Sequence, residues 1–461
     1  MHPANQPAIS DLGHAPVQSL FFRFYVPSLV SMASIAFHQI INGIILGQQL
    51  GKEALAAISL YTPVLFFCIA FVLAVMIGGG ILFSRNAGAQ RYGDAQRVFR
   101  FCTTLVVLVT GLVALSAPFI TSFLVGQLAA GQSPLIVQYT TECALWNLLF
   151  LPAFGLRVLW GGFLSNDNGP DVSRNASLLS ALVNIALDVL LVIVFPFGVA
   201  GAAIATGLAL LAGLAYLVVR IRNRSGHIDL HQFRFTLQLA DWRELLRLGF
   251  PSVVSELSVA VGFLLLNWTL LPYGTLAVSA FGVVNLLSNL FLRLFTASML
   301  AVQPIMAFNI GARHPRRVLE TLRFALVFCF ALGVVVVLIG TFLADFMVGV
   351  VAGKESAAFR LVATRAIGLS FLLFLATGAN YCLVMYLQII GKSVLSTAIN
   401  ITRGFALIAL FLYALPTMFH LNGVWLARPL AEISLLLGLS GYLWLRRGVF
   451  FSEEAILKRA S

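Results

Sequence analysis

One carboxylate, Asp188, lies in the middle of an apolar run that extends from about residue 178 to residue 197. Asn184 precedes Asp188 by four residues, so the two side chains share a face if the run is helical. If the run crosses a membrane, an ionisable group at that depth costs roughly 2.5–3.5 kcal/mol to insert. Such a group is a candidate for lining an ion path or a substrate cavity. The alternative is a structural polar anchor between helices.

The composition predicts an all-α polytopic membrane protein. The chain has 461 residues, of which 60% are hydrophobic and 10% charged, whereas a soluble protein carries about 25% charged residues. Its formal net charge of +12 is typical of basic loops on the cytoplasmic side of a membrane. The basic residues are scattered among apolar stretches rather than collected on one domain, so we expect no nucleic-acid partner.

Apolar stretches of the length that a membrane-spanning helix needs, ~20 residues, occur twelve times in the sequence. In the first half they run roughly over 20–46, 54–83, 98–125, 135–163, 174–196 and 199–221. In the second half they run roughly over 244–272, 277–309, 318–349, 361–390, 394–416 and 422–445. Glu256 lies in the seventh of these stretches and is the second candidate carboxylate.

The distribution of lysine and arginine predicts the orientation in the membrane. Basic residues gather after the even-numbered spans, and the connections after spans 3, 5, 7 and 11 carry almost none. Lys354 and Arg360, after span 9, are the exception. We therefore predict that both termini are cytoplasmic, and we expect a multi-pass protein of the cell inner or plasma membrane.

The chain also repeats itself, with an offset of 222 to 224 residues. The segment YVPSLVS at 25–31 matches GFPSVVS at 249–255, and NAGA at 86–89 matches NIGA at 309–312. Each copy contains six spans, an even number, so the two copies have the same orientation and form a parallel repeat about an axis along the membrane normal. Transporters of this type bind their substrate near the bilayer midplane.

The repeat predicts the domain organisation. We expect a cytoplasmic N-terminal tail at 1–19, an N-lobe of six spans at 20–221, a cytoplasmic linker at 222–243, a C-lobe of six spans at 244–446 and a cytoplasmic tail at 447–461.

Six segments of the chain stand in a characteristic order and spacing: INGIILGQQLGKEALAAISLYTPV, GGGILFSRNAGAQRYGDA, GLRVLWGGFLSNDNGPDVS, LVNIALDVLL, GVAGAAIATG and VQPIMAFNIGA. In these motifs the chain resembles the multidrug and toxic compound extrusion (MATE) transporters over nearly its whole length. The resemblance implies a secondary active antiporter that exports hydrophobic, often cationic, organic compounds in exchange for H+ or Na+ by alternating access. The larger group to which this family belongs also contains flippases for lipid-linked saccharides.

The resemblance also implies where the coupling ion binds. Asp188, Asn184 and Thr206 match the acid, the amide and the hydroxyl of the family's N-lobe cation site. The family usually has an aspartate in its first helix, and this chain has Asn42 at that position. Asp188 therefore lacks a second carboxylate as its neighbour.

A second cation or substrate site is expected in the C-lobe. Glu256 resembles an acid that some members of the family use for coupling. Those members also have an aspartate in the tenth helix, where this chain has no acid but carries Asn380. The sequence leaves open which of the two lobes carries the coupling to H+ or Na+.

Two other classes of function remain as alternatives. A flippase or exporter for a lipid-linked or amphipathic metabolite would need several basic residues in its cavity, and the candidates are Arg157, Arg293 and Arg428. An intramembrane enzyme would need a nucleophile–base pair or a metal set within the spans. No HExxH, GxSxG or paired-aspartate motif occurs, so we expect no enzymatic activity.

No cofactor is expected beyond the coupling ion, and no bound metal. The five cysteines form no CxxC pair and no cluster with histidine, so neither a disulfide framework nor a zinc site is indicated. The expected partners are small organic substrates and the lipid bilayer, and we take the chain to be a monomer.

Overall fold

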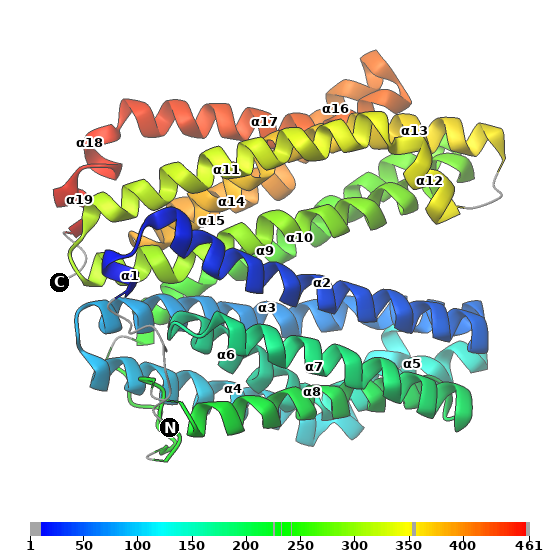
Figure 1. Cartoon of the computed structure of the whole chain (residues 1–461). Helices are drawn as coiled ribbons and strands as arrows, with labels where there is room; N and C mark the ends of the chain where they lie inside the picture. The colour runs from blue at the N-terminus through cyan, green and yellow to red at the C-terminus, as the bar shows by residue number, and fades with distance from the viewer. Residues whose placement is uncertain (1–10, 225, 232, 241, 353–355, 458–461) are drawn as a thin grey trace. The chain divides into compact units, whose positions relative to one another are not determined.

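The structure is a computed structural model that describes residues 11–224, 226–231, 233–240, 242–352 and 356–457. The first part of the predicted N-terminal tail, the end of the C-terminal tail and Lys354 lie outside the described residues. Every element within the described ranges is helical. The prediction of an all-α polytopic protein is thereby confirmed (Figure 1).

Eleven helices in the described part of the chain are long and apolar enough to cross a membrane, and a bent pair makes a twelfth. The bent pair is α5 (Pro134–Leu149) with α6 (Leu151–Asn166), which meet at 49° in the middle of the predicted span 135–163. Pro152 is the second residue of α6, and proline disfavours a helical conformation at the residue before it and removes a backbone donor. The bend therefore has a local cause in the sequence.

The chain divides into two compact units. The first unit comprises Val26–Gly249, and the second comprises Asp11–Tyr25 together with the described residues from Phe250 onward. Both divisions fall one residue before a proline of the repeated motif, Pro27 within α2 and Pro251 within α9.

The first unit is a bundle of helices packed along their lengths. Its elements are α2 (Val17–Leu50) from Val26 onward, α3 (Lys52–Gly88), α4 (Tyr92–Leu128), α5, α6, α7 (Pro170–Asp188), the π-helical turn η1 (Val189–Val194), α8 (Gly198–Arg222) and the start of α9 (Trp242–Leu270). Packing is closest between α7 and α8, and α3 also packs against α4 and α6.

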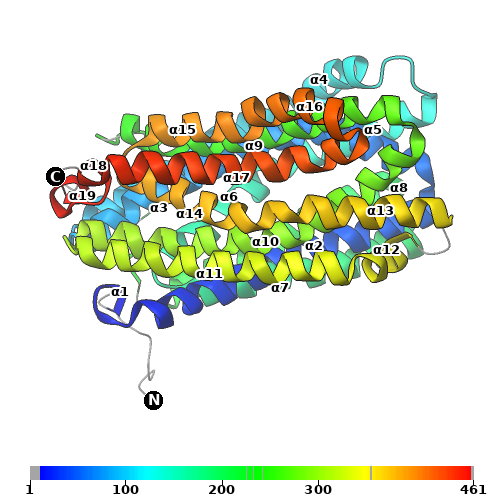
Figure 2. The same ribbon diagram turned by 90° about the horizontal axis from the view of Figure 1, so that it is seen from above.

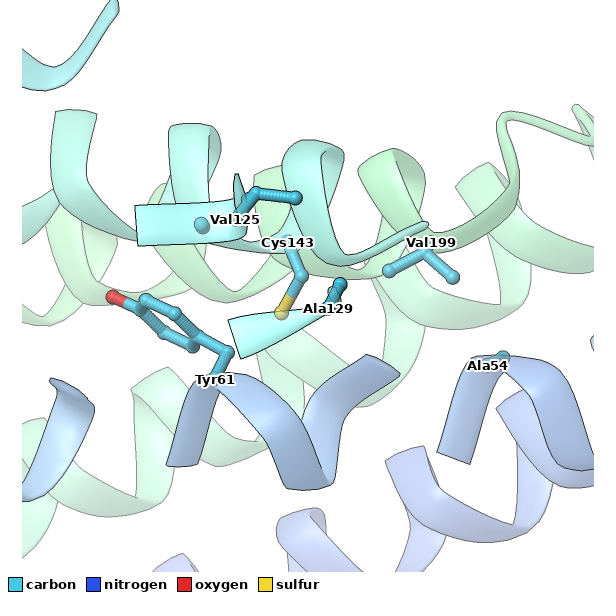
Figure 3. Packing of buried hydrophobic residues seen from close by; sticks show 7 residues of the cluster. Ala54, Tyr61, Val125, Ala129, Cys143 and Val199 are labelled. Atoms are coloured by element: carbon cyan, nitrogen blue, oxygen red, sulfur yellow. The ribbon is translucent and has the colours of Figure 1, made fainter. Parts of the chain in front are cut away.

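Small and aromatic side chains close one end of this bundle. Figure 3 shows Ala54 and Tyr61 of α3 lying against Cys143 of α5 and Val199 of α8, and all four are buried. Alanine at such positions lets the helices approach closely, as is common in membrane bundles. This cluster fixes the start of α8, the helix that carries Thr206.

The second unit is also all helical (Figure 2). Its elements are α1 (Asp11–His14), the first part of α2, most of α9, η2 (Leu271–Tyr273), α10 (Thr275–Gly311), α11 (Pro315–Phe342), α12 (Ala344–Ala352), α13 (Ala357–Ser370), η3 (Phe371–Leu373), α14 (Phe374–Ile389), α15 (Ser393–Ile401), η4 (Thr402–Ala406), α16 (Leu407–Phe419), α17 (Leu421–Leu445), α18 (Arg447–Phe450) and α19 (Glu453–Leu457). The central helix is α14, which packs against α10, α11 and α17.

The fifth and eleventh spans, which correspond in the repeat, share one irregularity. Each contains a π-helical turn, η1 directly after Asp188 and η4 between α15 and α16. Such turns insert one extra residue into the helical ladder and are frequent at functional sites. Both candidate regions described next adjoin one of these turns.

Candidate functional site

Asp188 is the last residue of α7, and its side chain is fully buried, with 0% exposure. The helix presents Asn184 on the same face one turn earlier, and Asn184 is 2% exposed. Thr206 comes from α8, the helix packed most closely against α7. The pairing of these two helices therefore brings together the three N-lobe residues predicted from the sequence.

A chain of hydrogen bonds joins the three side chains. The Asn184 amide contacts the Thr206 hydroxyl at 3.3 Å. With the amide assigned so that its nitrogen faces the carboxylate, Asn184 also donates to Asp188 Oδ2 at 3.2 Å. In this assignment the Asn184 oxygen accepts from the Thr206 main-chain N–H at 3.2 Å. The Thr206 hydroxyl can then donate to the Ala202 carbonyl of its own helix at 3.0 Å. One carboxylate oxygen is thus held by an amide that Thr206 orients.

The other carboxylate oxygen, Asp188 Oδ1, is buried and accepts no hydrogen bond from the described residues. A buried carboxylate oxygen without a donor is costly, because desolvation of the charge is left uncompensated. Protonation of the group removes that cost, and so does coordination of a small cation by the oxygen. The site can therefore hold one proton or one monovalent cation at Asp188.

Asn42 lies at the level of these residues. A cluster formed by Leu46 of α2, Val192 of η1 and Ala202 of α8 packs in the first unit. Each of the three site residues lies one helical turn from a member of this cluster, and all three lie to the same side of it. Asn42 is four residues before Leu46, Asp188 is four residues before Val192, and Thr206 is four residues after Ala202.

The Asn42 side chain adds a second acceptor to this region. Its Oδ1 atom is buried and accepts no hydrogen bond among the described residues. An amide carbonyl is a neutral oxygen ligand, whereas an aspartate at this position would bring a second negative charge. The N-lobe region therefore combines one carboxylate with neutral oxygen and amide groups.

The C-lobe pair predicted from the sequence is divided between different neighbours. Glu256 lies on α9, is partly buried and is within electrostatic reach of Arg293 and Arg403. Asn380 lies on α14, is fully buried and donates to Glu432 of α17, to Oε2 at 2.7 Å and to the main-chain oxygen at 3.0 Å. Among the described residues no hydrogen bond joins Glu256 to Asn380. The structure thus places Glu432 where Asn380 can orient it.

Arg403 is a further buried charge, and it was not among the site residues expected from the sequence. It lies in the π-helical turn η4, and its Nε atom is 3.7 Å from Glu432 Oε1. Its guanidinium also lies 4.7 Å from the ring centroid of Tyr381 and contacts the Ser255 hydroxyl at 3.4 Å. The signal was present in the sequence, because an arginine in the apolar stretch 394–416 is a charge within a predicted span.

Two other arginines within the spans, Arg428 and Arg157, also have defined surroundings. Glu432, four residues after Arg428 on α17, forms its ion pair with Arg403. Arg428 lies within electrostatic reach of Glu432 and lines a small pocket with Ser288 and Trp425. Arg157 is buried in the first unit, where it donates to the Ser177 hydroxyl. Arg157 is therefore an interior residue that pairs with α7 rather than one that reaches toward solvent.

Known proteins resemble this chain over nearly its whole length. The model of the family described as MatE matches residues 27–190 and 251–416. The probable multidrug resistance protein YoeA of Bacillus subtilis is 23% identical, over 97% of this chain and 99% of that protein. The multidrug export protein MepA of Staphylococcus saprophyticus is 24% identical, over 92% of this chain and 88% of that protein.

Solved structures share the fold. An outward-facing multidrug resistance MATE family transporter superposes with a TM-score of 0.87 at 21% identity, covering 95% of this chain and 97% of that chain. A MOP superfamily transporter from Pyrococcus furiosus, described as having a binding pocket of reversed polarity, has a TM-score of 0.87 at 22% identity, covering 96% of this chain and 98% of that chain. These likenesses establish the architecture of two helical bundles.

Proposed function

This chain belongs to the MatE family, and on that premise we propose that it is a secondary active antiporter that exports hydrophobic, often cationic, organic compounds in exchange for H+ or Na+. Relatives that match the chain nearly end to end are described as multidrug export or resistance proteins. We place it in the inner or plasma membrane with both termini cytoplasmic, and we assign it no enzymatic activity.

One observation carries the proposal: a fully buried carboxylate in a membrane helix, with one oxygen held by an oriented amide and the other without a donor among the described residues. Such a carboxylate responds to a proton or to a bound cation, because either one removes its uncompensated charge. Asp188 is therefore the proposed coupling group.

The transport cycle follows from the neighbours of Asp188. When Asp188 takes up H+ or Na+, the Asn184 amide loses its ionised acceptor, and the hydrogen bond between Asn184 and Thr206 rearranges with it. Because α7 and α8 pack closely, such a change is transmitted to both helices. A ligand shifts a conformational equilibrium only through its differential affinity for the two states. Ion uptake and export of a cationic substrate are then coupled if both depend on the ionisation of Asp188.

The test is efflux of a fluorescent lipophilic cation from proteoliposomes under an imposed pH or Na+ gradient. We expect a gradient to drive efflux by the wild-type protein and Asp188→Asn to abolish it. Asp171→Asn is the matched control, because Asp171 lies on the same helix but has an exposed side chain, paired with Arg174. This variant should transport as the wild type does.

Glu256→Gln, run in parallel, tests the second lobe. Loss of gradient-driven efflux in this variant alone would place coupling in the C-lobe and overturn the role of Asp188. If neither gradient drives efflux and both variants match the wild type, the antiporter proposal fails.

The second candidate is an exporter or flippase of an amphipathic anion or lipid-linked metabolite. The observation that favours it is the number of basic side chains within the C-lobe, since Arg403 joins Arg293 and Arg428. The same proteoliposomes distinguish the candidates if a fluorescent lipophilic anion or a labelled lipid-linked saccharide replaces the cation.

A further inference from the structure

A pocket of about 810 Å³ lies in the first unit, between the start of α4 and the linker that precedes α9. Three arginines, Arg97, Arg100 and Arg234, line it together with the linker segment from Phe235 to Ala240. We refer to it as the arginine pocket. None of these residues belongs to the transport site described above.

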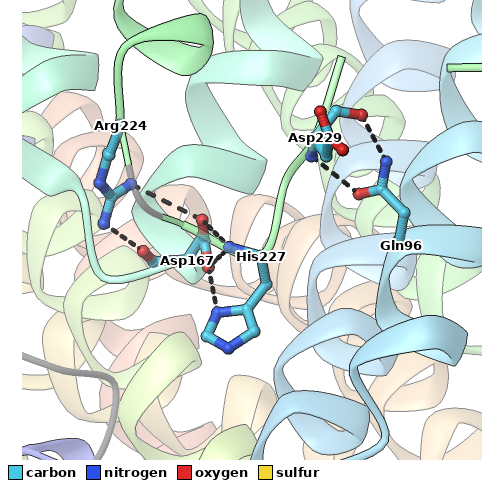
Figure 4. Close-up of polar contacts among 5 residues, drawn as sticks. All are labelled: Gln96, Asp167, Arg224, His227 and Asp229. Atoms are coloured by element: carbon cyan, nitrogen blue, oxygen red, sulfur yellow. Dashed lines mark hydrogen bonds and ion pairs between the residues drawn. The ribbon is translucent and has the colours of Figure 1, made fainter. Parts of the chain in front are cut away.

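The linker is fixed along one face of α4. Gln96, Arg100 and Thr104 are spaced four residues apart, so they form one row on this helix. At one end of the row Gln96 donates to the Asp229 carbonyl at 2.6 Å and accepts from the Asp229 main-chain N–H at 3.2 Å (Figure 4). At the other end the Thr236 main-chain N–H donates to the Thr104 hydroxyl at 3.0 Å. Arg100 lies between these two anchors.

Behind Asp229 the linker is held by a second set of contacts. Figure 4 shows the Asp167 carboxylate facing His227 and Arg224. Asp167 is 1% exposed and accepts from the His227 main-chain N–H at 3.1 Å. The Arg224 guanidinium donates to the Asp167 main-chain oxygen at 2.6 Å. The pocket wall formed by the linker is therefore held in place before any ligand binds.

The charges in the pocket favour an anion. Arg100 Nε is buried and donates to no acceptor among the described residues, and Arg234 is exposed with no ion pair in that part of the chain. Arg97 pairs with Asp94 at 3.2 Å. Arg100 lies within electrostatic reach of the Asp229 carboxylate but forms no ion pair with it. The guanidinium groups of Arg100 and Arg234 thus have no ion-pair partner among the described residues and can bind an oxyanion.

The carboxylate of Asp229 is engaged elsewhere. The His231 main-chain N–H donates to it at 2.7 Å and holds the pKa of Asp229 below its usual range. Asp229 therefore stays ionised; its carboxylate contacts His231 and also lies within electrostatic reach of Arg100.

The pocket lies at the edge of the apolar part of α4. Arg100 is followed directly by the apolar run that begins at Phe101, and Thr104, which anchors the linker, lies one turn further along. The 37 residues of α4 exceed the ~20 that cross the hydrocarbon core, so its first turns extend to the level of the lipid headgroups. On either side of Thr236, the linker exposes 68% of Phe235 and 58% of Leu237.

We propose that the arginine pocket binds the headgroup phosphate of an anionic phospholipid. Arginine presents planar, paired donors that match phosphate oxygens. Basic pockets at the ends of membrane helices recognise such headgroups, and each basic residue near an anionic surface strengthens binding. The exposed Phe235 and Leu237 favour a lipid over free phosphate, because only a lipid brings acyl chains that contact them.

The test uses the full-length protein, delipidated in detergent, with bound lipid counted by native mass spectrometry. Phosphatidylglycerol, phosphatidylethanolamine and inorganic phosphate are the probes. We expect phosphatidylglycerol to bind more tightly than phosphatidylethanolamine. Removing both free guanidinium groups with Arg100→Gln and Arg234→Gln should weaken phosphatidylglycerol binding by roughly 25-fold, about fivefold for each arginine.

Arg222→Gln is the matched control, because Arg222 is an exposed arginine at the end of α8 that does not line the pocket. It should bind phosphatidylglycerol as the wild type does. Arg234→Gln alone tests the proposal without disturbing a buried group. Phe235→Ala should weaken binding of the lipid and leave binding of inorganic phosphate unchanged.

Three results would overturn the proposal. One is equal affinity for the two lipids. Another is equal loss of affinity in Arg234→Gln and Arg222→Gln. The third is displacement of phosphatidylglycerol by inorganic phosphate at equal concentration, which would make the pocket a site for free phosphate. None of these readouts involves transport, so the proposed antiport and the proposed lipid site can fail independently.

Discussion

Arg403 and Glu432 are charged side chains that depend on each other. Their exposed fractions are 5% and 8%, and the two lie 3.7 Å apart. Removing a charge from water is costly, and the cost is recovered only where a partner and further hydrogen bonds are in place. Asn380 supplies one such hydrogen bond to Glu432, and the Tyr381 ring supplies a face to the guanidinium of Arg403. The cluster is therefore stable as a whole but sensitive to the loss of one member.

Glu432→Gln and Arg403→Met should each lower the free energy of unfolding by about 3–5 kcal/mol, because each removes the ion-pair partner of a buried charge. The double variant should recover most of that loss. Thermal unfolding of the purified variants, treated as a double-mutant cycle, measures both effects.

The exposed pair Asp345 and Arg360 provides the control. Its oxygen–nitrogen distance is 2.6 Å, but the two side chains are 65% and 43% exposed. Asp345→Asn should therefore lower the free energy of unfolding by at most about 1 kcal/mol. If Glu432→Gln or Arg403→Met lowers the free energy of unfolding by no more than this, Arg403 and Glu432 do not stabilise each other.

At the scale of elements, the position of Thr206 depends on how α8 fits against the bend between α5 and α6. Gly207, the next residue, faces the ring of Phe150, which lies at the bend. A Cβ atom at Gly207 would lie 2.1 Å from the ring carbon Cγ of Phe150. Because that distance is far below van der Waals contact, only glycine lets α8 approach the bend this closely.

Gly207→Ala should reduce the free energy of unfolding by about 1–3 kcal/mol through overpacking. It should also reduce gradient-driven efflux, since the adjacent Thr206 shifts with the helix. Thermal unfolding and proteoliposome transport measure the two effects.

Gly111→Ala, in α4, is the matched substitution, because a Cβ atom there meets nothing within 4 Å. It should be neutral or slightly stabilising, as alanine is the better helix former. Phe150→Ala combined with Gly207→Ala should restore part of the lost stability. A Gly207→Ala protein as stable as the Gly111→Ala protein would contradict the close packing of α8 on the bend.

At the scale of the whole molecule, the arginines after the even-numbered spans predict one orientation in the membrane. A cysteine at Gln132, in the exposed connection between α4 and α5, should therefore face the outside. A cysteine at Asn223, directly after α8, should face the cytoplasm. In a Cys68→Ala background, a membrane-impermeant maleimide should label Gln132→Cys in intact cells and Asn223→Cys only after permeabilisation. The reverse pattern would invert the predicted orientation of the chain.

The sequence by itself determined the number and order of the spans, the parallel repeat and the placement of Asp188 beside Asn184. These features depend on apolar length and on the 3.6-residue period of a helix, which are local properties of the chain. The bend at the fourth span is also local in origin, since it follows from Pro152, although its angle of 49° came from the structure.

Only the tertiary structure decided which helix faces which. Asn380 was predicted beside Glu256, but it orients Glu432, and Glu432 contacts Arg403 from another span rather than Arg428 one turn away. The arginine pocket exists because the linker folds back onto Gln96 and Thr104, more than 130 residues earlier in the chain. Such partners are set by the packing of whole helices and by the path of the loops, and the spacing of residues along one helix does not encode them.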